Sequence, residues 1–299
     1  ELSARGAQCI VLDALTYAGH PENLRGLAHV TLIEGDIGDG ALVSDLLLTH
    51  RPQALFHLAA ESHVDNSIAA PAGFVRTNVN GTYTLLEATR QYWMTLDSRA
   101  RESFRFMQVS TDEVYGALGE EGAFHPETPL APNSPYSASK AAGDLLARAW
   151  HHTYGLPVIT TRCSNNYGPR QHPEKLIPHM VMQALKGENI TIYGEGSQTR
   201  SFCYVDDLIE GFVRFMSQTE TVGPMNIGNP GEFTMMELAE LTLKLVGGRS
   251  KIVHKPLPAD DPRQRQPDIT LARRTLGWEP RVPLEEGLRR TIAYFRDHA

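Results

Sequence analysis

Short runs of apolar and β-branched residues alternate with stretches of helical character, and this rhythm restricts the fold of the chain most strongly. The runs are CIVLD, VTLIEGD, ALFHLAA, FRFMQVS and PVITTRC, and helical stretches are expected among them at residues 40–50, 72–93 and 135–154. Asn133 or Ser134 is expected to cap the last helix, ahead of Pro135. Strands that alternate with helices build βαβ units around a parallel sheet. The sequence therefore predicts an α/β protein with a doubly wound parallel sheet.

The composition of the sequence changes after residue 168. Gly and Pro become frequent in YGPRQHPEKLIP, YGEGSQTR and NIGNPGEF, and such segments form irregular loops between helices. We expect residues 1–168 to form a dinucleotide-binding domain, with residues 202–228 returning to it. Residues 169–299 are expected to form mainly a smaller, interleaved α/β lobe that binds the substrate.

Charge and cysteine content narrow the classes of function. The net charge of −7 is spread without a basic stripe, which argues against a nucleic-acid or membrane-surface partner. No apolar run is long enough to span a bilayer. Cys9, Cys163 and Cys203 lack the spacing of a metal site or redox motif. We therefore expect no metal and a reducing, cytoplasmic location.

Polar side chains follow four of the predicted strands where each strand ends. They are Asp13, Asp36, Glu61 with Ser62, and Thr111 with Asp112 and Glu113. Ligands of open parallel sheets bind beyond the carboxyl ends of the strands. Polar residues also end strands for no functional reason, but four strand ends in a row favour a ligand site.

Asp13 matches the acidic residue that binds the ribose hydroxyls of a dinucleotide in a Rossmann-like fold. The Gly-rich turn that normally stands about 20 residues earlier would fall before residue 1. We therefore expect that turn and the first strand to lie in a segment missing from this chain. An acid at the ribose repels a 2′-phosphate and so favours NAD over NADP. The alternative is that Asp13 only caps a turn.

Tyr136 stands four residues before Lys140 in SPYSASK, so the two side chains share one face of a helix. An ammonium group beside a phenol stabilises phenolate and makes the phenol a usable base near neutral pH. The pair alone is also common on solvated helix faces. Together with VSTDEVYG, residues 109–116, it becomes a specific signal.

Several motifs together resemble the nucleotide-sugar 4,6-dehydratases of the extended short-chain dehydrogenase/reductase superfamily. They are LDALTYAGHPENL, GDI, HLAAESHVDNSI, TNVNGTYTLLEATR, VSTDEVYG, PYSASKAAGD and TTRCSNNYGPRQHPEKLIP. The resemblance covers nearly the whole chain. The last third, from YGEGSQTRSFCYVDDLIEG onward, is more similar to UDP-glucuronate decarboxylase.

The resemblance implies that the enzyme converts dTDP-glucose or a UDP-hexose to a 4-keto-6-deoxy sugar, with bound NAD. Tyr136 and Lys140 would serve the oxidation at C4, with Thr111 orienting the 4-hydroxyl. Glu113 would remove the C5 proton, and a protonated Asp112 would donate a proton to the departing C6 hydroxyl. Two adjacent carboxyl groups in a cleft do not both ionise cheaply, which keeps one protonated.

The resemblance also implies which residues contact the ligands. The NAD contacts are Asp13, Asp36, Ile37, Leu58, Ala59, Ala60, Tyr136 and Lys140. The nucleotide-sugar contacts are Ser62, Asn165, Lys175, Leu176, Tyr193, Arg200 and Arg265. Arginine suits phosphate because its planar fork pairs with two oxygens, although a surface ion pair would also explain Arg200 or Arg265 taken singly.

Three alternative functions remain open from the sequence alone. UDP-glucuronate decarboxylases carry Ser where this chain has Asp112, because decarboxylation needs no leaving-group acid. A 4-epimerase needs Tyr136 and Lys140 but no acid pair, and a non-catalytic NAD-binding protein would need none of these groups. The resemblance further implies a homodimer in which residues 72–93 and 135–154 of each subunit form a four-helix bundle.

Overall fold

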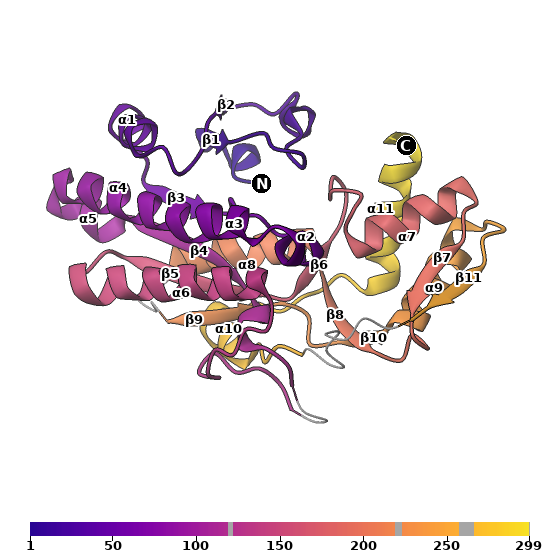
Figure 1. Ribbon diagram of the computed structural model, residues 1–299. Coiled ribbons are helices and arrows are strands. Elements are labelled where there is room, and N and C mark those ends of the chain that lie inside the picture. Colours follow the sequence, from indigo (N-terminus) through magenta and orange to yellow (C-terminus); the bar gives the residue numbers. More distant parts are fainter. Residues whose placement is uncertain (119–121, 219–222, 257–265, 299) are drawn as a thin grey trace. The chain divides into compact units, whose positions relative to one another are not determined.

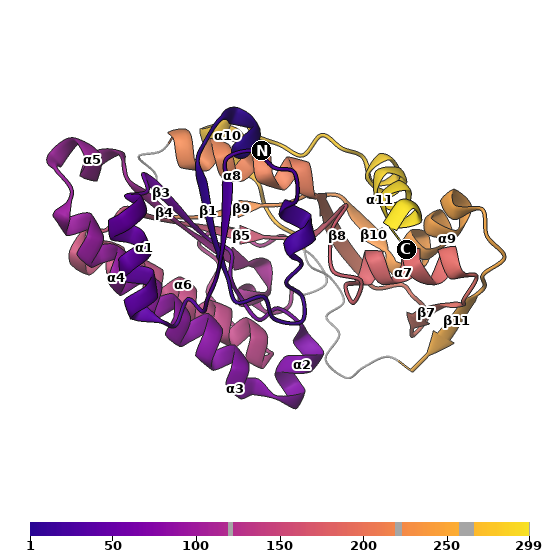
Figure 2. The ribbon, with the colours of Figure 1, turned by 90° about the horizontal axis from the view of Figure 1, so that it is seen from above.

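The computed structural model describes residues 1–118, 122–218, 223–256 and 266–298. Its parallel strands confirm the predicted α/β class. One sheet holds β1 (Cys9–Asp13) and β2 (Val30–Glu34). A second sheet has the order β3-β4-β5-β9, and its strands are Ala54–His57, Arg105–Thr111, Val158–Cys163 and Pro224–Ile227. Figure 2 shows the strands of this sheet lying side by side.

Helices separate these strands along the chain. They are α1 (Gly40–His50), α2 (Val64–Ala69), α3 (Pro71–Phe74), α4 (Thr82–Thr95), α5 (Ser98–Ser103) and α6 (Pro135–Tyr154). Helices α4 and α6 pack against each other and run side by side in Figure 1. Apolar side chains from α1, α4, α6, β4 and β5 form a common core, with Leu86, Phe104, Phe106 and Ala147 fully buried.

The predicted helix at residues 72–93 is wrong in one respect, because it is not a continuous α-helix. A π-helical segment, Val75–Gly81, lies between α3 and α4. A β-carbon on Gly81 would lie 2.7 Å from Cδ1 of Ile37, so the Ile37 side chain would have to move for any other residue at this position. A π-helical segment turns side chains away from the α-helical repeat and is frequent at functional sites.

Local signals explain the bounds of α6. The Ser134 side chain accepts a hydrogen bond from the N–H of Ser137, whose own side chain accepts one from Ser134. Pro135 occupies the first helical position, where its missing N–H costs nothing. Gly155 ends the helix with a positive φ of 73°. The predicted bounds and the Ser134 cap are confirmed.

The chain divides into two compact units. Unit 1 comprises Glu1–Gly116, Pro129–Arg162 and Gln218–Pro224, and unit 2 comprises Ala117–Thr128, Cys163–Ser217 and Met225–Ala299. The assignment of residues 1–168 with 202–228 to NAD binding, and of residues 169–299 to the substrate, stays a prediction.

Unit 2 contains two small sheets and five helices among its described residues. The first sheet has the order β10-β8-β6 and the second pairs β11 with β7. The strands are β6 (Asn165–Tyr167), β7 (Ile190–Tyr193), β8 (Thr199–Tyr204), β10 (Glu232–Thr234) and β11 (Ile252–Lys255). The helices are α7 (Leu176–Lys186), α8 (Val205–Gln218), α9 (Met235–Val246), α10 (Thr270–Leu276) and α11 (Leu284–His298). Helices α7, α9 and α11 share one apolar core with β7 and β8.

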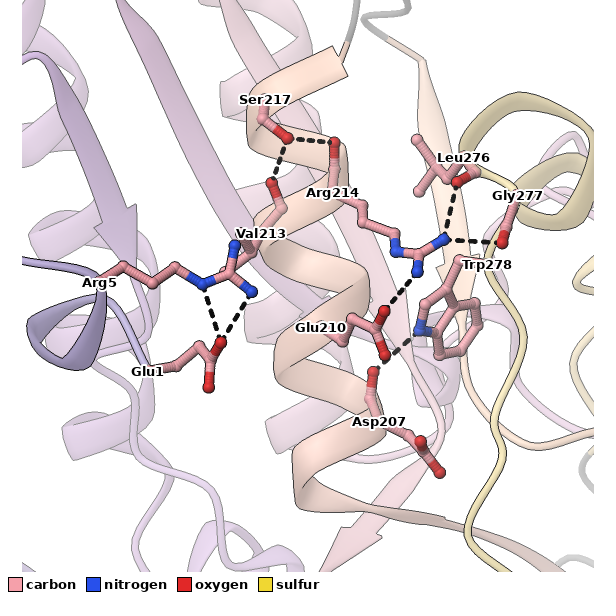
Figure 3. A network of polar contacts seen from close by, with 10 residues as sticks. All are labelled: Glu1, Arg5, Asp207, Glu210, Val213, Arg214, Ser217, Leu276, Gly277 and Trp278. Carbon is pink, nitrogen blue, oxygen red and sulfur yellow. Dashed lines mark hydrogen bonds and ion pairs between the residues drawn. The ribbon is translucent and has the colours of Figure 1, made fainter.

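Asp207 at the start of α8 has a structural role (Figure 3). Its main-chain oxygen accepts a hydrogen bond from the indole of the buried Trp278 at 2.9 Å. Its carboxylate accepts the N–H groups of Arg281 and Val282 at 3.0 and 2.8 Å. Further along the helix, Arg214 donates to the carbonyl of Gly277 at 2.8 Å. These bonds tie the segment after α10 to α8. No helix in the described part of the chain is both long and apolar enough to cross a bilayer.

Candidate active site

The acid pair lies where β4 ends and a 3-10 turn, Asp112–Tyr115, begins. The hydroxyl of Thr111 accepts the N–H of Glu113 at 3.3 Å and lies 3.4 Å from a carboxylate oxygen of Asp112. A threonine hydroxyl that caps the first N–H groups of a turn is a common local arrangement. Thr111 therefore holds both acids at the carboxyl end of a buried strand.

The two carboxyl groups have different surroundings. Asp112 is only 2% exposed, whereas Glu113 is partly exposed. Burial disfavours the ionised form of a carboxyl group. Of the two acids, Asp112 is thus the more shielded from water.

Tyr136 and Lys140 lie on the first two turns of α6, which packs against β4 and the 3-10 turn. Both residues are nearly buried, at 9% and 6% exposure. The ammonium group of Lys140 donates a hydrogen bond to the carbonyl of Val109 in β4 at 2.7 Å. This bond brings the charge of Lys140 to the strand that carries Thr111, Asp112 and Glu113. Every predicted catalytic residue belongs to unit 1.

Asn78, from the π-helical segment, connects the parts of this site, and its role was not recognised from the sequence. Its side chain accepts the N–H of Glu61 and donates to the carbonyl of Glu61, both at 2.9 Å. It also donates to the hydroxyl of Ser139 at 2.9 Å, and that hydroxyl donates to the carbonyl of Tyr136 at 2.7 Å. The loop after β3 is thereby joined to the helical turn between Tyr136 and Lys140. The only sequence signal was a polar residue inside an expected helix face.

His57 is a buried histidine at the end of β3, near Lys140. Its ring lies 2.9 Å from the hydroxyl of Thr82, which donates to the carbonyl of Asn78. Burial, and then the charge of Lys140, lower the pKa of His57 to about 3. The imidazole is therefore neutral near pH 7, so that it does not add a second positive charge beside Lys140.

Apart from Tyr136 and Lys140 on α6, the residues predicted to contact NAD lie at or just beyond the ends of β1, β2 and β3. Asp13 is exposed, and its carboxylate accepts the N–H of Leu15 at 2.8 Å. Asp36 similarly accepts the N–H of Gly38 at 2.7 Å. Leu58 is 59% exposed, with Ala59 and Ala60 half-buried beside it. Ile37 differs, because its side chain is 6% exposed and packs in the core, so that only its main chain is available to a ligand.

The residues predicted to contact the nucleotide sugar belong to unit 2, except for the exposed Ser62 of unit 1. Lys175 and Leu176 form the start of α7, and Asn165 begins β6. Tyr193 ends β7 and is 47% exposed. Arg200 is a buried residue of β8 whose guanidinium donates to the carbonyl of Thr199 at 2.7 Å. Arg265 lies outside the described residues.

Comparisons of the sequence identify its relatives. The sequence model of the GDP-mannose 4,6 dehydratase family matches residues 2–291. The dTDP-glucose 4,6-dehydratase of Xanthomonas campestris is 45% identical, with 99% of this chain and 88% of the relative covered. That of Escherichia coli is 41% identical, with 95% of this chain and 84% of the relative covered. These matches include the last third of the chain.

Solved structures share the fold. A dTDP-glucose 4,6-dehydratase from Streptomyces venezuelae with NAD bound has a TM-score of 0.88 and 40% identity, covering 96% of this chain and 87% of that one. A UDP-glucose 4-epimerase from Thermotoga maritima with UDP-glucose has a TM-score of 0.91 but 32% identity, covering 99% and 93%. Because the epimerase matches as well in fold, the fold does not separate the two reactions. Sequence identity favours the dehydratase, at 40% against 32%.

Proposed function

The chain belongs to the nucleotide-sugar 4,6-dehydratases, an NAD-dependent family of lyases, and we propose that its substrate is dTDP-glucose. The curated relatives that carry this substrate in their names match almost the whole chain. The observation that carries the residue assignment is the acid pair at the end of β4, packed against the helix of Tyr136 and Lys140.

The residues present fit NAD. An exposed carboxylate, Asp13, ends β1, and an exposed apolar side chain, Leu58, follows β3. We assign the ribose hydroxyls to Asp13 and further contacts to Asp36, Leu58, Ala59, Ala60 and the main chain of Ile37, with Tyr136 and Lys140 at the reactive end. Bound there, NAD would supply the acceptor for the hydride of C4 and, once reduced, the hydride donor for C6.

The first step is the oxidation at C4. Tyr136 removes the proton of the 4-hydroxyl, and Thr111 orients that hydroxyl. Lys140 stabilises the phenolate form of Tyr136, because an ammonium group in a nearly buried setting attracts it strongly. The step leaves a ketone at C4, which makes the proton at C5 acidic.

The second step is the loss of water across C5 and C6. Glu113 removes the C5 proton, and Asp112 gives its proton to the C6 hydroxyl, which leaves as water. The burial of Asp112 and the partial exposure of Glu113 support this division of roles. After hydride is returned to C6, Glu113 gives a proton to C5, so that the product is the 4-keto-6-deoxy sugar.

The nucleotide is assigned to unit 2. Lys175 and Arg200 provide positive charge for the diphosphate, with Asn165, Leu176 and Tyr193 contacting the rest of the nucleotide. Ser62 of unit 1 and Arg265, which lies outside the described residues, complete the assigned set.

A homodimer is proposed through α4 and α6. Tyr83, Met94, Leu145 and Tyr154 on these helices are 50%, 53%, 55% and 47% exposed, which is unusual for large apolar side chains. Two such helix pairs would form a four-helix bundle. Cys9, Cys163 and Cys203 are free thiols, which supports a reducing, cytoplasmic location.

The acid pair provides the test of this function. With dTDP-glucose, Asp112→Asn should still oxidise C4 but lose water slowly, so that reduced cofactor accumulates in stopped-flow absorbance. Glu113→Gln should also stall and should lose deuterium exchange at C5. Asp45→Asn, an exposed acid on α1, is the control and should behave like the unchanged enzyme. Normal turnover by both acid variants would overturn the assignment.

A further inference from the structure

Arg162, Asp144 and Tyr115 form a buried polar cluster that none of the proposed steps uses. Two guanidinium nitrogens of Arg162 donate to the two carboxylate oxygens of Asp144, at 2.8 and 3.2 Å. The third donates to the phenolic oxygen of Tyr115 at 3.0 Å. The three residues are 6%, 3% and 3% exposed, in the order Arg162, Asp144, Tyr115.

The cluster joins two parts of the active site. Asp144 follows Lys140 by four residues on α6 and so lies on the face that also carries Tyr136. Tyr115 is the last residue of the 3-10 turn that holds Asp112 and Glu113. A single side chain from β5, Arg162, thus links the helix of the base to the turn of the acid pair.

The geometry fixes the position of Tyr115 closely. The central carbon of the Arg162 guanidinium lies 4.9 Å from the centre of the Tyr115 ring, and the guanidinium also bonds the hydroxyl. In the same 3-10 turn, the carbonyl of Val114 accepts a hydrogen bond from the N–H of Ala131 at 3.0 Å. Although burial opposes the charge of Arg162, the bonds to Asp144 raise its pKa, so it stays a cation.

A role in stability alone is a weak explanation for such a cluster. A buried ion pair often stabilises a protein no more than apolar side chains of the same size. What the cluster does provide is a fixed distance between two groups that must act on one sugar in succession. A misplacement of about 1 Å in such an arrangement can cost roughly a hundredfold in rate.

We infer that Tyr115 is a positioning residue for the elimination step. Held by Arg162 and Asp144, it fixes the turn that carries Glu113 and Asp112 relative to the helix of Tyr136 and Lys140. The inference rests on the proposed roles of the acid pair. Loss of the Tyr115 hydroxyl should therefore slow water loss and leave the oxidation at C4 unchanged.

The test compares Tyr115→Phe with a matched control, Tyr92→Phe. Tyr92 is also buried, at 4% exposure, and its hydroxyl donates to the carbonyl of Pro52 at 3.0 Å, away from the acid pair. Single turnovers with dTDP-glucose separate the rise of reduced cofactor from its decay. For Tyr115→Phe we expect an unchanged rise, a decay slower by on the order of 10- to 100-fold, and slower deuterium exchange at C5. For Tyr92→Phe we expect both phases to be unchanged.

A second variant, Asp144→Asn, acts at the other end of the cluster. It should likewise leave the rise of reduced cofactor unchanged and slow its decay. Equal slowing of both phases in either variant, or decay as fast as that of Tyr92→Phe, would overturn the inference. Glu113→Gln distinguishes this failure from a failure of the proposed function. If Glu113→Gln stalls while Tyr115→Phe does not, only the positioning role is wrong, whereas normal decay in Glu113→Gln removes the basis of both.

Discussion

The role proposed for Tyr136 as a base depends on the setting that its neighbours provide. Lys140 brings a positive charge to the end of β4, and Asn78, through Ser139, holds the main chain of Tyr136. His57 remains neutral beside Lys140, because protonation of a buried imidazole next to an ammonium group is costly. Lys140 thus provides the positive charge beside the end of β4, while the neighbouring His57 adds none.

Tyr136→Phe should slow the oxidation at C4 by roughly two to four orders of magnitude, the usual cost of losing a general base. The protein should fold, because the ring that packs near Phe74 is kept. Stopped-flow absorbance of reduced cofactor measures the step. Tyr294→Phe, on α11, is the control, and a normal rate of oxidation in Tyr136→Phe would exclude Tyr136 as the base.

His57 makes the stability of the protein depend on pH. Its pKa is about 3 in the folded protein, against the ordinary histidine value of 6.5, so the unfolded chain binds more protons between these values. The contribution of His57 to the free energy of unfolding should therefore be largest above pH 6.5 and should decrease as the pH is lowered toward 3. The expected loss attributable to His57 is about 2 kcal/mol between pH 6.5 and pH 5. Urea unfolding at both pH values measures it.

His57→Gln should remove most of this pH dependence, whereas His152→Gln should leave it in place because His152 is exposed. The same loss between pH 6.5 and pH 5 in His57→Gln and in the unchanged protein would show that His57 is not its source.

At the scale of elements, α6 is the part on which the site depends most. It carries Tyr136 and Lys140 on its first two turns and Asp144 on its third, and it packs against β4, the 3-10 turn and the π-helical segment. α6 meets the π-helical segment closely at Gly143, where a β-carbon would lie 3.1 Å from the carbonyl oxygen of Asn78. A helix with such close neighbours holds its side chains in fixed directions, including those of the proposed catalytic residues Tyr136 and Lys140.

Ser134→Ala should reduce the free energy of unfolding by about 1 kcal/mol, because it removes the N-cap of α6 and half of the capping box. Urea unfolding measures the change. Ser103→Ala is the matched control, since the Ser103 hydroxyl is exposed and donates to the carbonyl of Ala100 without capping a helix start. Equal effects of the two substitutions would contradict a capping role for Ser134.

At the scale of the whole molecule, the exposed faces of α4 and α6 bear on assembly. Trp150 packs edge to face against Tyr83 and Tyr154, with ring centres 5.7 and 5.5 Å apart, and Arg90 lies over the Tyr154 ring. Such an aromatic surface is typical of a protein interface. It is expected to be buried in the proposed homodimer.

Leu145→Asp should dissociate the dimer, because it places a charge in an apolar interface. Leu48→Asp is the control, since Leu48 is similarly exposed, at 57%, but lies on α1. Light scattering coupled to size-exclusion chromatography gives the mass of each species. A monomeric unchanged protein, or a Leu145→Asp variant that stays dimeric, would contradict the proposed interface.

Much of the fold follows from local sequence patterns. The β-rich runs became β1 to β5, and the bounds of α1 and α6 agree with their predictions, because apolar periodicity and caps act within a few residues. The Tyr136 and Lys140 pair was likewise readable, since a spacing of four places two side chains on one helix face. The continuous α-helix predicted at 72–93 was not correct, because a π-helical segment, Val75–Gly81, interrupts it.

Only the tertiary structure decided the contacts between residues far apart in the sequence. Asn78 and Ser139 are 61 residues apart, and Tyr115 and Arg162 are 47 apart. A single polar residue in a helix or strand has no local pattern that names its partner, so neither link was predicted. The difference in burial between Asp112 and Glu113 likewise arises from packing between distant segments. The sequence by itself determined which chemical groups the site contains, and packing determined which of them are dry, charged and held in place, because burial and long-range hydrogen bonds arise only when distant segments meet.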